Sequence, residues 1–476
     1  MGPSLPQSDR DARARSDGLA IKRDLYHYDY AYPPGIAVAR DLPPGEEFTM
    51  CFVSRIMAIQ RATFENGMQS SVRCEDSRAN HRLSFLMTAG RALLSPAELA
   101  SSLGTQLTDH ARMMRDDRPA TVLGYNELYA TIERPSVAAD YQDDFVFAWQ
   151  RIAGANPMVL RALTKLPEHY RFDAGAFRAA ARKHYGPSYE GPSFDAALAA
   201  GRMFVADYSL LADVPNGSWL GVPQYLFAPI ALFCWFPPIG RFPARLMPIA
   251  IQEGQAGDSR VADPSESAAW ILAKTAVQVA DLVWHEARAH LGLTHLVMEG
   301  VTIATQRQLS SRHPLHVLLT PHCRFTLAIN DFAKHHLIVP GGQVEQYIAP
   351  TINGFLGVVA KTLGEFRWKD LALRADLAAR GMDDVTRLPL YPYRDDALDL
   401  WDAIERFVGE YVGLYYRNAD AVADDVELLA WTNELGAQDG ARLGGITPPS
   451  TPAELTQLLT FFIFTASAQH SALNYA

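Results

Sequence analysis

One stretch of the chain, Ser265–Gly300, constrains the fold more than any other. Its apolar residues recur with helical period over its whole length, it contains no proline, and Gly292 is the main interior breaker. A periodic apolar pattern of this kind predicts a long helix that packs into a core. The sequence therefore favours one large, mainly helical domain rather than several separate ones.

The rest of the chain fits this interpretation. We expect further helices at 56–64, 92–103, 141–156, 314–334, 345–363, 397–415, 424–435 and 452–474. The clear β signal lies at 201–252, where GRMFVADYSLL, APIALFCWF and RLMPIAIQ are apolar and the last two are joined by the turn PPIGRFPA. We predict a single domain over 25–476 with a small β element. The polar residues 1–24 are expected to be a disordered tail.

Composition excludes several classes. The 476 residues are 48% hydrophobic and 20% charged, and the net charge of −10 argues against a nucleic-acid binder. The cysteines, Cys51, Cys74, Cys234 and Cys323, form no CxxC pair, so we expect free, mostly buried thiols rather than a zinc site or disulfides. The start of the chain has no signal-peptide pattern, and no long uninterrupted apolar run occurs. We expect a cytoplasmic monomer without a transmembrane segment, for which transient membrane contact stays open.

The segment WHEARAHLGLTH carries His285, His290 and His295. The zinc-protease motif HExxH needs its second histidine four residues on, but Ala289 stands there and His290 is five on. On a regular α-helix, rings five residues apart point about 140° apart. A π-helical segment with i→i+5 bonding would bring them into register. The pair is thus either coincidental or a metal site on a π-distorted helix.

A second cluster, FTASAQHSALN, places His470 and Asn474 four residues apart, hence on one face of an α-helix. A histidine ring and an asparagine carbonyl on the same face can both reach a metal. Three imidazoles with oxygen ligands suit iron better than calcium or a structural zinc.

From about Tyr141 to its end, the chain resembles the lipoxygenase family. The segments YQDDFVFAWQRIAGANPM, GRMFVADY, APIALFCWF and LMPIAIQ are similar to the family's early helix and strands. The long region from WILAKTAVQVADLVWHEARAHLGLTH to FTLAIN resembles its signature, and YPYRDDALDLWDAI and FTASAQHSALNY complete the likeness. It looks like a short bacterial catalytic domain without the N-terminal β-barrel. The resemblance implies a mainly α fold with a long π-distorted central helix, and residues 25–140 resemble no family we can name.

The resemblance also implies a metal centre. His285 and His290 are matched to the two iron histidines of the central helix, His470 to the third, and Asn474 to a weak oxygen ligand. His295 is matched to a family histidine that is not a ligand. The implied cofactor is a non-haem iron that cycles between Fe2+ and Fe3+, and no catalytic residue beyond the metal site is implied.

The implied reaction is the insertion of O2 into the 1,4-pentadiene unit of a polyunsaturated fatty acid, which gives a hydroperoxide. Leu291 and Leu337 resemble leucines that line the substrate channel, and Ala349 lies where the family carries Ala or Gly. In the family, alanine at this position correlates with hydroperoxide products of S configuration. Three alternatives remain: a catalytically impaired homologue that binds lipid, a hydroperoxide isomerase, and a zinc hydrolase, which the histidine spacing disfavours.

In one respect the chain departs from the family. Family members continue for ~100 or more residues after the third histidine, the size of a small domain, and end in a carboxylate that is an iron ligand. We therefore expect the 476-residue protein to hold iron poorly. We also expect part of the apolar run Leu458–Ala468 to face water.

Overall fold

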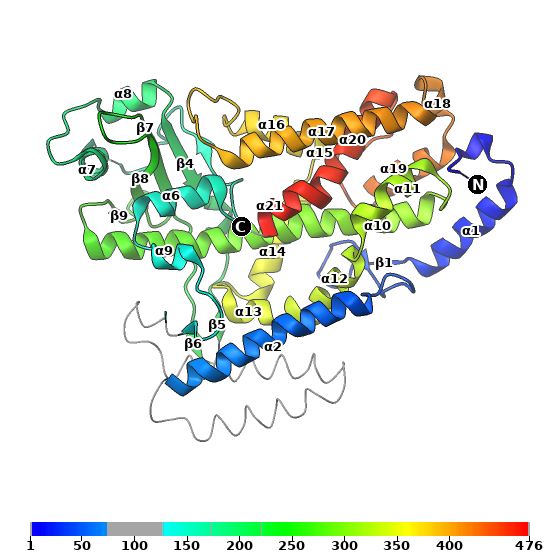
Figure 1. Ribbon diagram of the computed structural model, residues 1–476, viewed down its shortest axis with the longest axis horizontal. Coiled ribbons are helices and arrows are strands. Elements are labelled where there is room, and N and C mark those ends of the chain that lie inside the picture. The colour runs from blue at the N-terminus through cyan, green and yellow to red at the C-terminus, as the bar shows by residue number, and fades with distance from the viewer. Residues whose placement is uncertain (1, 74–125, 127, 173, 220, 475–476) are drawn as a thin grey trace.

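A computed structural model describes residues 2–73, 126, 128–172, 174–219 and 221–474. Its centre is one continuous helix, coloured green in Figure 1. It begins with α9 (Ser267–Trp284), continues as the π-helix η4 (His285–Leu296) and ends with α10 (Val297–Gln308). The predicted long, π-distorted central helix is therefore confirmed.

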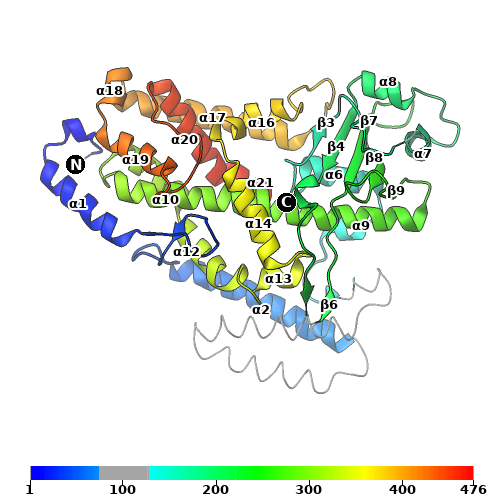
Figure 2. The same ribbon diagram turned by 180° about the vertical axis from the view of Figure 1, so that it is seen from behind.

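Helices surround this central helix on several sides. The helix α14 (Ile352–Gly364) crosses it at η4, as the view from behind shows (Figure 2), and α19 (Val426–Gly436) packs on α10. The long α17 (Pro392–Tyr415) lies along α20 (Pro452–Phe464). The last helix continues through the π-helix η7 (Thr465–Gln469) into α21 (His470–Asn474).

The main β element is a five-stranded antiparallel sheet in the order β3-β4-β7-β8-β9. Its strands are β3 (Arg161–Ala162), β4 (Met203–Asp207), β7 (Ile230–Phe236), β8 (Arg245–Gln252) and β9 (Val261–Ala262). Every residue of β7 is buried, which explains its continuous apolar run. The predicted hairpin of β7 and β8 is confirmed, because the two strands pair in antiparallel register.

Shorter elements connect these parts. The first half of the described chain also has η1 (Pro6–Ser8), α1 (Ala12–Leu25), β1 (Tyr28–Asp29), β2 (Val38–Ala39), α2 (Met50–Arg73), α5 (Ser136–Ala139), α6 (Asp144–Ala153), α7 (Ala174–Tyr185), α8 (Phe194–Ala199), η3 (Ser209–Leu211), β5 (Ser218–Trp219) and β6 (Val222–Pro223). The second half also has α11 (Pro314–Leu319), η5 (Thr320–Cys323), α12 (Thr326–Phe332), η6 (Ala333–Leu337), α13 (Gln343–Tyr347), α15 (Trp368–Leu371), α16 (Leu373–Ala379) and α18 (Ala419–Ala423). The helix expected at 92–103 lies outside the described residues.

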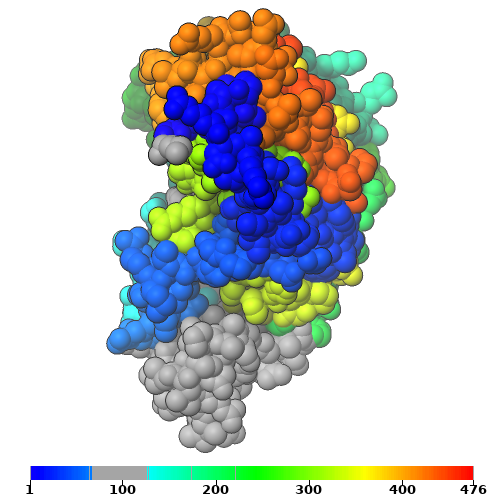
Figure 3. Space-filling view, turned by 90° about the vertical axis from the view of Figure 1, so that its right-hand side faces the viewer, coloured from blue at the N-terminus to red at the C-terminus, as the bar shows by residue number. Residues whose placement is uncertain are grey.

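The prediction that residues 1–24 are disordered is wrong for the part that the structure describes. The helix α1 packs on α10, and the N-terminal segment covers one end of the molecule beside the orange helices (Figure 3). The side chain of Arg15 is buried, and its guanidinium group pairs with Glu427 at 2.5 Å and with Asp9 at 2.8 Å. Polar composition suggested disorder, but ion pairs from Arg15 to Glu427 and from Arg312 to Asp9 join this segment to distant parts of the chain.

We expected part of Leu458–Ala468 to face water, but residues 458–465 are buried and only residues 466–468 of this run are partly exposed. Leu459 and Phe462 are fully buried, and Phe464 packs its ring on Trp401 of α17 at 5.2 Å between centroids. The packing of α20 on α17 therefore covers this helix.

Two smaller predictions can be compared with the structure. Cys234 and Cys323 are buried free thiols, Cys51 is an exposed one, and Cys74 lies outside the described residues. Among the described residues, no helix is long and apolar enough to cross a membrane.

Candidate metal centre

The π-helix η4 sets the register of the histidines. In its wider turn, the hydroxyl of Thr294 donates to the carbonyl oxygen of Ala289, five residues back, at 2.8 Å. A Cβ atom at Gly292 would lie only 2.8 Å from the Ala287 carbonyl oxygen, again five residues back. Glycine at this position therefore lets the backbone adopt the π turn and lets α14 approach closely.

The i→i+5 register places three histidines in one row. The ring centroids of His285 and His290 are 5.6 Å apart, and those of His290 and His295 are 4.7 Å apart. The face-to-face stacking of His285 on His290, with 13° between the planes, is the arrangement that a regular α-helix would not allow.

A fourth histidine approaches this row from another helix. His470 begins α21, directly after η7, and α21 contacts η4. In Figure 1, α21 (red) crosses the middle of the green central helix. The Nε2 atom of His295 lies 3.1 Å from that of His470 and 3.2 Å from that of His290. The donor atoms of these three histidines all lie within 4.8 Å of one another.

The structure groups the histidines differently from the predicted ligand set. It brings His290 and His470 together as expected, but the third member of the cluster is His295, which the sequence reasoning had set aside. The Nε2 atom of His285 instead donates to the carbonyl oxygen of Leu473 at 2.9 Å. The spacing His-x4-His-x4-His contained the missing signal, since the i→i+5 argument applies equally to its second pair.

Glu286 links two of these rings. One carboxylate oxygen lies 3.2 Å from Nδ1 of His285, and the other lies 2.9 Å from Nδ1 of His290. Burial opposes ionisation of Glu286, but its hydrogen bonds to both histidines outweigh burial and hold the pKa of Glu286 below its ordinary value. The carboxylate therefore fixes both Nδ1 atoms as donors, so that His290 presents Nε2 to the cluster.

The cluster itself is electrostatically suited to a cation. Burial and the neighbouring His290 and His470 lower the pKa of His295 to about 3. Burial, together with His290, also lowers the pKa of His470. Both rings are therefore neutral at pH 7 and offer lone pairs. Burial also opposes protonation of His285, but Glu286 outweighs it and raises the pKa of His285.

A buried carboxylate stands one turn beyond the cluster. Glu299 accepts hydrogen bonds from the Ala39 backbone N–H at 2.7 Å and from Asn330 Nδ2 at 2.9 Å. Burial outweighs these bonds and raises the pKa of Glu299 from 4.5 to about 7.

This shift predicts a pH dependence of stability. Between pH 4.5 and about 7 the unfolded chain has already released the Glu299 proton, whereas the folded protein retains it. The stability that Glu299 contributes is therefore lost as pH rises through this window, by at most about 1.4 kcal/mol per pH unit. In urea unfolding from pH 4.5 to 8, the free energy of unfolding of the wild type should fall relative to that of Glu299→Gln, and then level off. If the difference in free energy of unfolding between the two proteins stayed constant from pH 4.5 to 8, the raised pKa of Glu299 would be contradicted.

The other residues matched to the family site lie in several places. Leu291 is half-buried next to His290 on η4, and Leu337 is half-buried at the end of η6. Ala349 is 7% exposed, and its carbonyl oxygen accepts from the Gly217 N–H at 2.8 Å. Asn474 is the last residue of α21 and is exposed.

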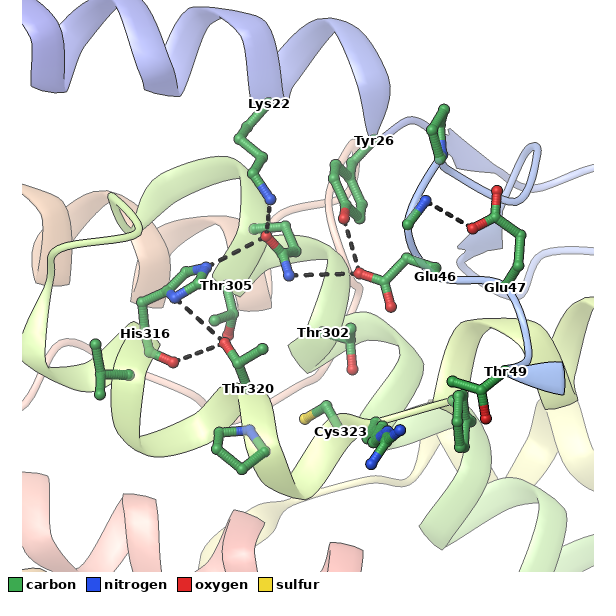
Figure 4. Close-up of a pocket in the computed structure, with 17 residues that line it drawn as sticks. Lys22, Tyr26, Glu46, Glu47, Thr49, Thr302, Thr305, His316, Thr320 and Cys323 are labelled. Carbon is green, nitrogen blue, oxygen red and sulfur yellow. Dashed lines mark hydrogen bonds between the residues drawn. The ribbon is translucent and has the colours of Figure 1, made fainter. Parts of the chain in front are cut away.

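A separate cavity of about 620 Å³ lies farther along α10, between that helix, α1 and η5 (Figure 4). Its polar side chains bond one another: Lys22 donates to Gln306 at 2.5 Å, and Tyr26 donates to Glu46 at 2.7 Å. None of the clustered histidines lines it. The cavity is thus distinct from the histidine centre.

Comparison with known proteins agrees with the fold. The chain is 33% identical to a protein of Pseudomonas aeruginosa named Linoleate 9/13-lipoxygenase, over 99% of this chain and 74% of that protein. It is 36% identical to the human Hydroperoxide isomerase ALOXE3, over 73% of this chain and 47% of that protein. The chain thus spans about half the length of this human relative.

Solved lipoxygenase structures also align with nearly the whole chain. A coral 8R-lipoxygenase aligns with a TM-score of 0.78 and 25% identity, over 99% of this chain and 65% of that chain. A manganese lipoxygenase aligns with a TM-score of 0.68 and 22% identity, over 97% of this chain and 75% of that chain, which shows likeness of fold alone. The family model described as Lipoxygenase matches residues 105–476. By this match and by its identity to the Pseudomonas protein, the chain belongs to the lipoxygenase family.

Proposed function

We propose that this chain is the catalytic part of a non-haem iron dioxygenase, whose iron is held by His290, His295 and His470. The observation that carries the proposal is that Nε2 of His295 lies within 3.2 Å of Nε2 of both His290 and His470, so that three imidazoles from two helices face one another. The proposal replaces His285 by His295 in the donor set expected from sequence, and Asn474 stays a predicted oxygen ligand.

The donor set fits a metal ion. Two nitrogens bound to one ion at right angles, each about 2.1 Å away, lie about 3.0 Å apart. Two of the three Nε2 separations, from His295 to His470 at 3.1 Å and from His295 to His290 at 3.2 Å, are close to this value. Three imidazole ligands suit iron and other first-row metals, and poorly suit calcium or magnesium.

Iron is the metal that the family resemblance implies, and manganese is the alternative, because one similar fold belongs to a manganese lipoxygenase. Imidazole nitrogens bind both iron and manganese. Elemental analysis of the protein purified from cells grown with both metals decides between them. Iron above manganese supports the proposal, and the reverse would replace iron by manganese in it.

A bound iron supplies the one-electron chemistry that couples a 1,4-pentadiene to O2, and the protein's share is to hold and orient the groups. Leu291, beside His290, and Leu337 and Ala349 are proposed to line the channel for the fatty acid chain. An aliphatic chain needs such apolar walls, since each CH2 that leaves water gains about 0.8 kcal/mol. The same walls keep water from the reacting carbon.

The proposed place of Ala349 gives a prediction about product chirality. In the family, the size of the side chain at this position correlates with the face of the fatty acid that O2 attacks. Ala349→Gly removes the methyl group, which should admit O2 to the other face and raise the R:S ratio of the hydroperoxide. A methyl-sized change in an apolar pocket discriminates by about 1–3 kcal/mol, so we expect at least about a tenfold change. Chiral-phase chromatography of the linoleate product measures it. An unchanged ratio in a variant with normal metal content would remove Ala349 from the channel.

The reaction is tested by two assays on metal-loaded protein. Oxygen uptake with linoleate, the substrate class in the name of the Pseudomonas relative, should exceed the rate without fatty acid and disappear in a metal-free sample. The second candidate is hydroperoxide isomerisation, which the human relative's name favours. Consumption of fatty acid hydroperoxide without oxygen uptake from linoleate would support the isomerase and overturn the dioxygenase.

A further inference from the structure

Asn330 is a buried side chain that reaches the histidine centre from a neighbouring element. It belongs to α12, is 6% exposed, and makes hydrogen bonds through both ends of its amide. Its Oδ1 atom lies 2.9 Å from Nδ1 of His295. Its Nδ2 atom donates to the His295 carbonyl oxygen at 3.1 Å and to Glu299 Oε2 at 2.9 Å.

These contacts determine which way the amide faces. Nδ2 has two hydrogens, and both neighbours on that side, a carbonyl and a carboxylate, can accept them. Oδ1 is therefore the atom that faces His295, and it can only accept. Nδ1 of His295 must then carry a proton, so that in the neutral ring the lone pair is at Nε2, the atom that faces His290 and His470.

Glu299 holds the amide in this orientation. It stands one helical turn after His295, and its other oxygen accepts the Ala39 N–H of β2 at 2.7 Å. The chain of hydrogen bonds thus runs from β2 through Glu299 and Asn330 to His295. Both Glu299 and Asn330 are buried, so water does not compete for these bonds.

We propose that Asn330, anchored by Glu299, is a positioning residue that fixes the tautomer and ring orientation of His295 and so prepares its Nε2 atom to bind the metal. The inference rests on the proposed metal centre. Without Asn330, the ring of His295 can rotate or carry its proton on Nε2, and either change opposes metal binding. Partners of this kind, which orient a ligand without touching the metal, typically contribute about 10–100-fold in metal affinity.

The test uses Co2+ alone as the probe, bound to the full chain after metal removal. We expect Asn330→Ala to weaken Co2+ binding by about 10–100-fold and to change the visible absorption of the bound ion. The matched control is Asn156→Ala, which removes another buried asparagine with a carboxylate partner, Asp281 at 2.8 Å, but leaves the Co2+ affinity unchanged.

A polarity exchange separates positioning from general destabilisation. In Asn330→Asp combined with Glu299→Gln, the new carboxylate can still accept from His295 Nδ1, and the new amide can donate to it. This double variant should bind Co2+ severalfold more tightly than Asn330→Ala, which offers no acceptor to His295 Nδ1.

The outcomes distinguish the inference from the proposal on which it rests. Failure of the wild type to bind Co2+ would overturn the metal centre itself. Normal Co2+ binding by Asn330→Ala, equal weakening by Asn156→Ala, or no recovery in a folded double variant would overturn only the role of Asn330. Circular dichroism checks that each variant is folded.

Discussion

Replacing His295 by alanine should weaken Fe2+ binding by more than about 100-fold. Loss of a residue that only orients a metal ligand typically weakens metal binding by about 10–100-fold, and loss of the ligand itself should weaken it more. Oxygen uptake with linoleate should disappear with the metal. The physical reason is that the Nε2 atom of His295 lies 3.1–3.2 Å from both other donors, so that one ion can bind all three. Metal content by elemental analysis and Fe2+ titration measure the effect.

The matched control is His285→Ala on the same π-helix. His285 uses Nε2 to bind the Leu473 carbonyl oxygen and Nδ1 to bind Glu286, so it has no free donor for a metal in this arrangement. We expect its loss to weaken Fe2+ binding by less than about tenfold, through looser packing of Glu286 against His290. The opposite order, with His285 essential and His295 dispensable, would restore the donor set that the family resemblance implied.

Removal of the Asp144 carboxylate should lower the free energy of unfolding strongly. Asp144 begins α6, and its carboxylate accepts from Lys274 Nζ and from the Trp270 indole N–H, each at 2.8 Å, and from Lys183 Nζ at 2.7 Å. The side chains of Asp144 and Lys274 are each only 4% exposed. Asp144→Ala would leave a buried ammonium group without its counter-charge, which costs about 3–5 kcal/mol.

Chemical unfolding of three variants measures this effect. The double variant Asp144→Ala with Lys274→Met should lose less stability than Asp144→Ala alone, because it removes the unpaired charge. An exposed pair provides the control: Arg374 and Asp402 are each 57% exposed, so Arg374→Ala should cost less than about 1 kcal/mol. A loss below about 1 kcal/mol in Asp144→Ala would show that Lys274 finds another partner.

The main features of the fold were predictable because they depend on local pattern. The apolar periodicity of Ser265–Gly300 predicts the central helix, and two apolar runs around a Pro/Gly turn predict the β7–β8 hairpin. The five-residue histidine spacing left a coincidental pair and a π-helix open, and the family resemblance implied the π-helix that η4 forms. Order in residues 2–24 was not predictable, because the partners of this segment, α10 and Glu427, lie far away in the chain.

Which histidines lie together depended on tertiary structure. A π-helix aligns His285, His290 and His295 equally well, so spacing favours neither adjacent pair. The packing of α21 on η4 distinguishes them: it brings His470 to the end of the row where His295 lies, and it sets the Leu473 carbonyl against His285. Local sequence aligns side chains along one helix, but only a second helix, placed by its own buried face, determines which of them can share an ion.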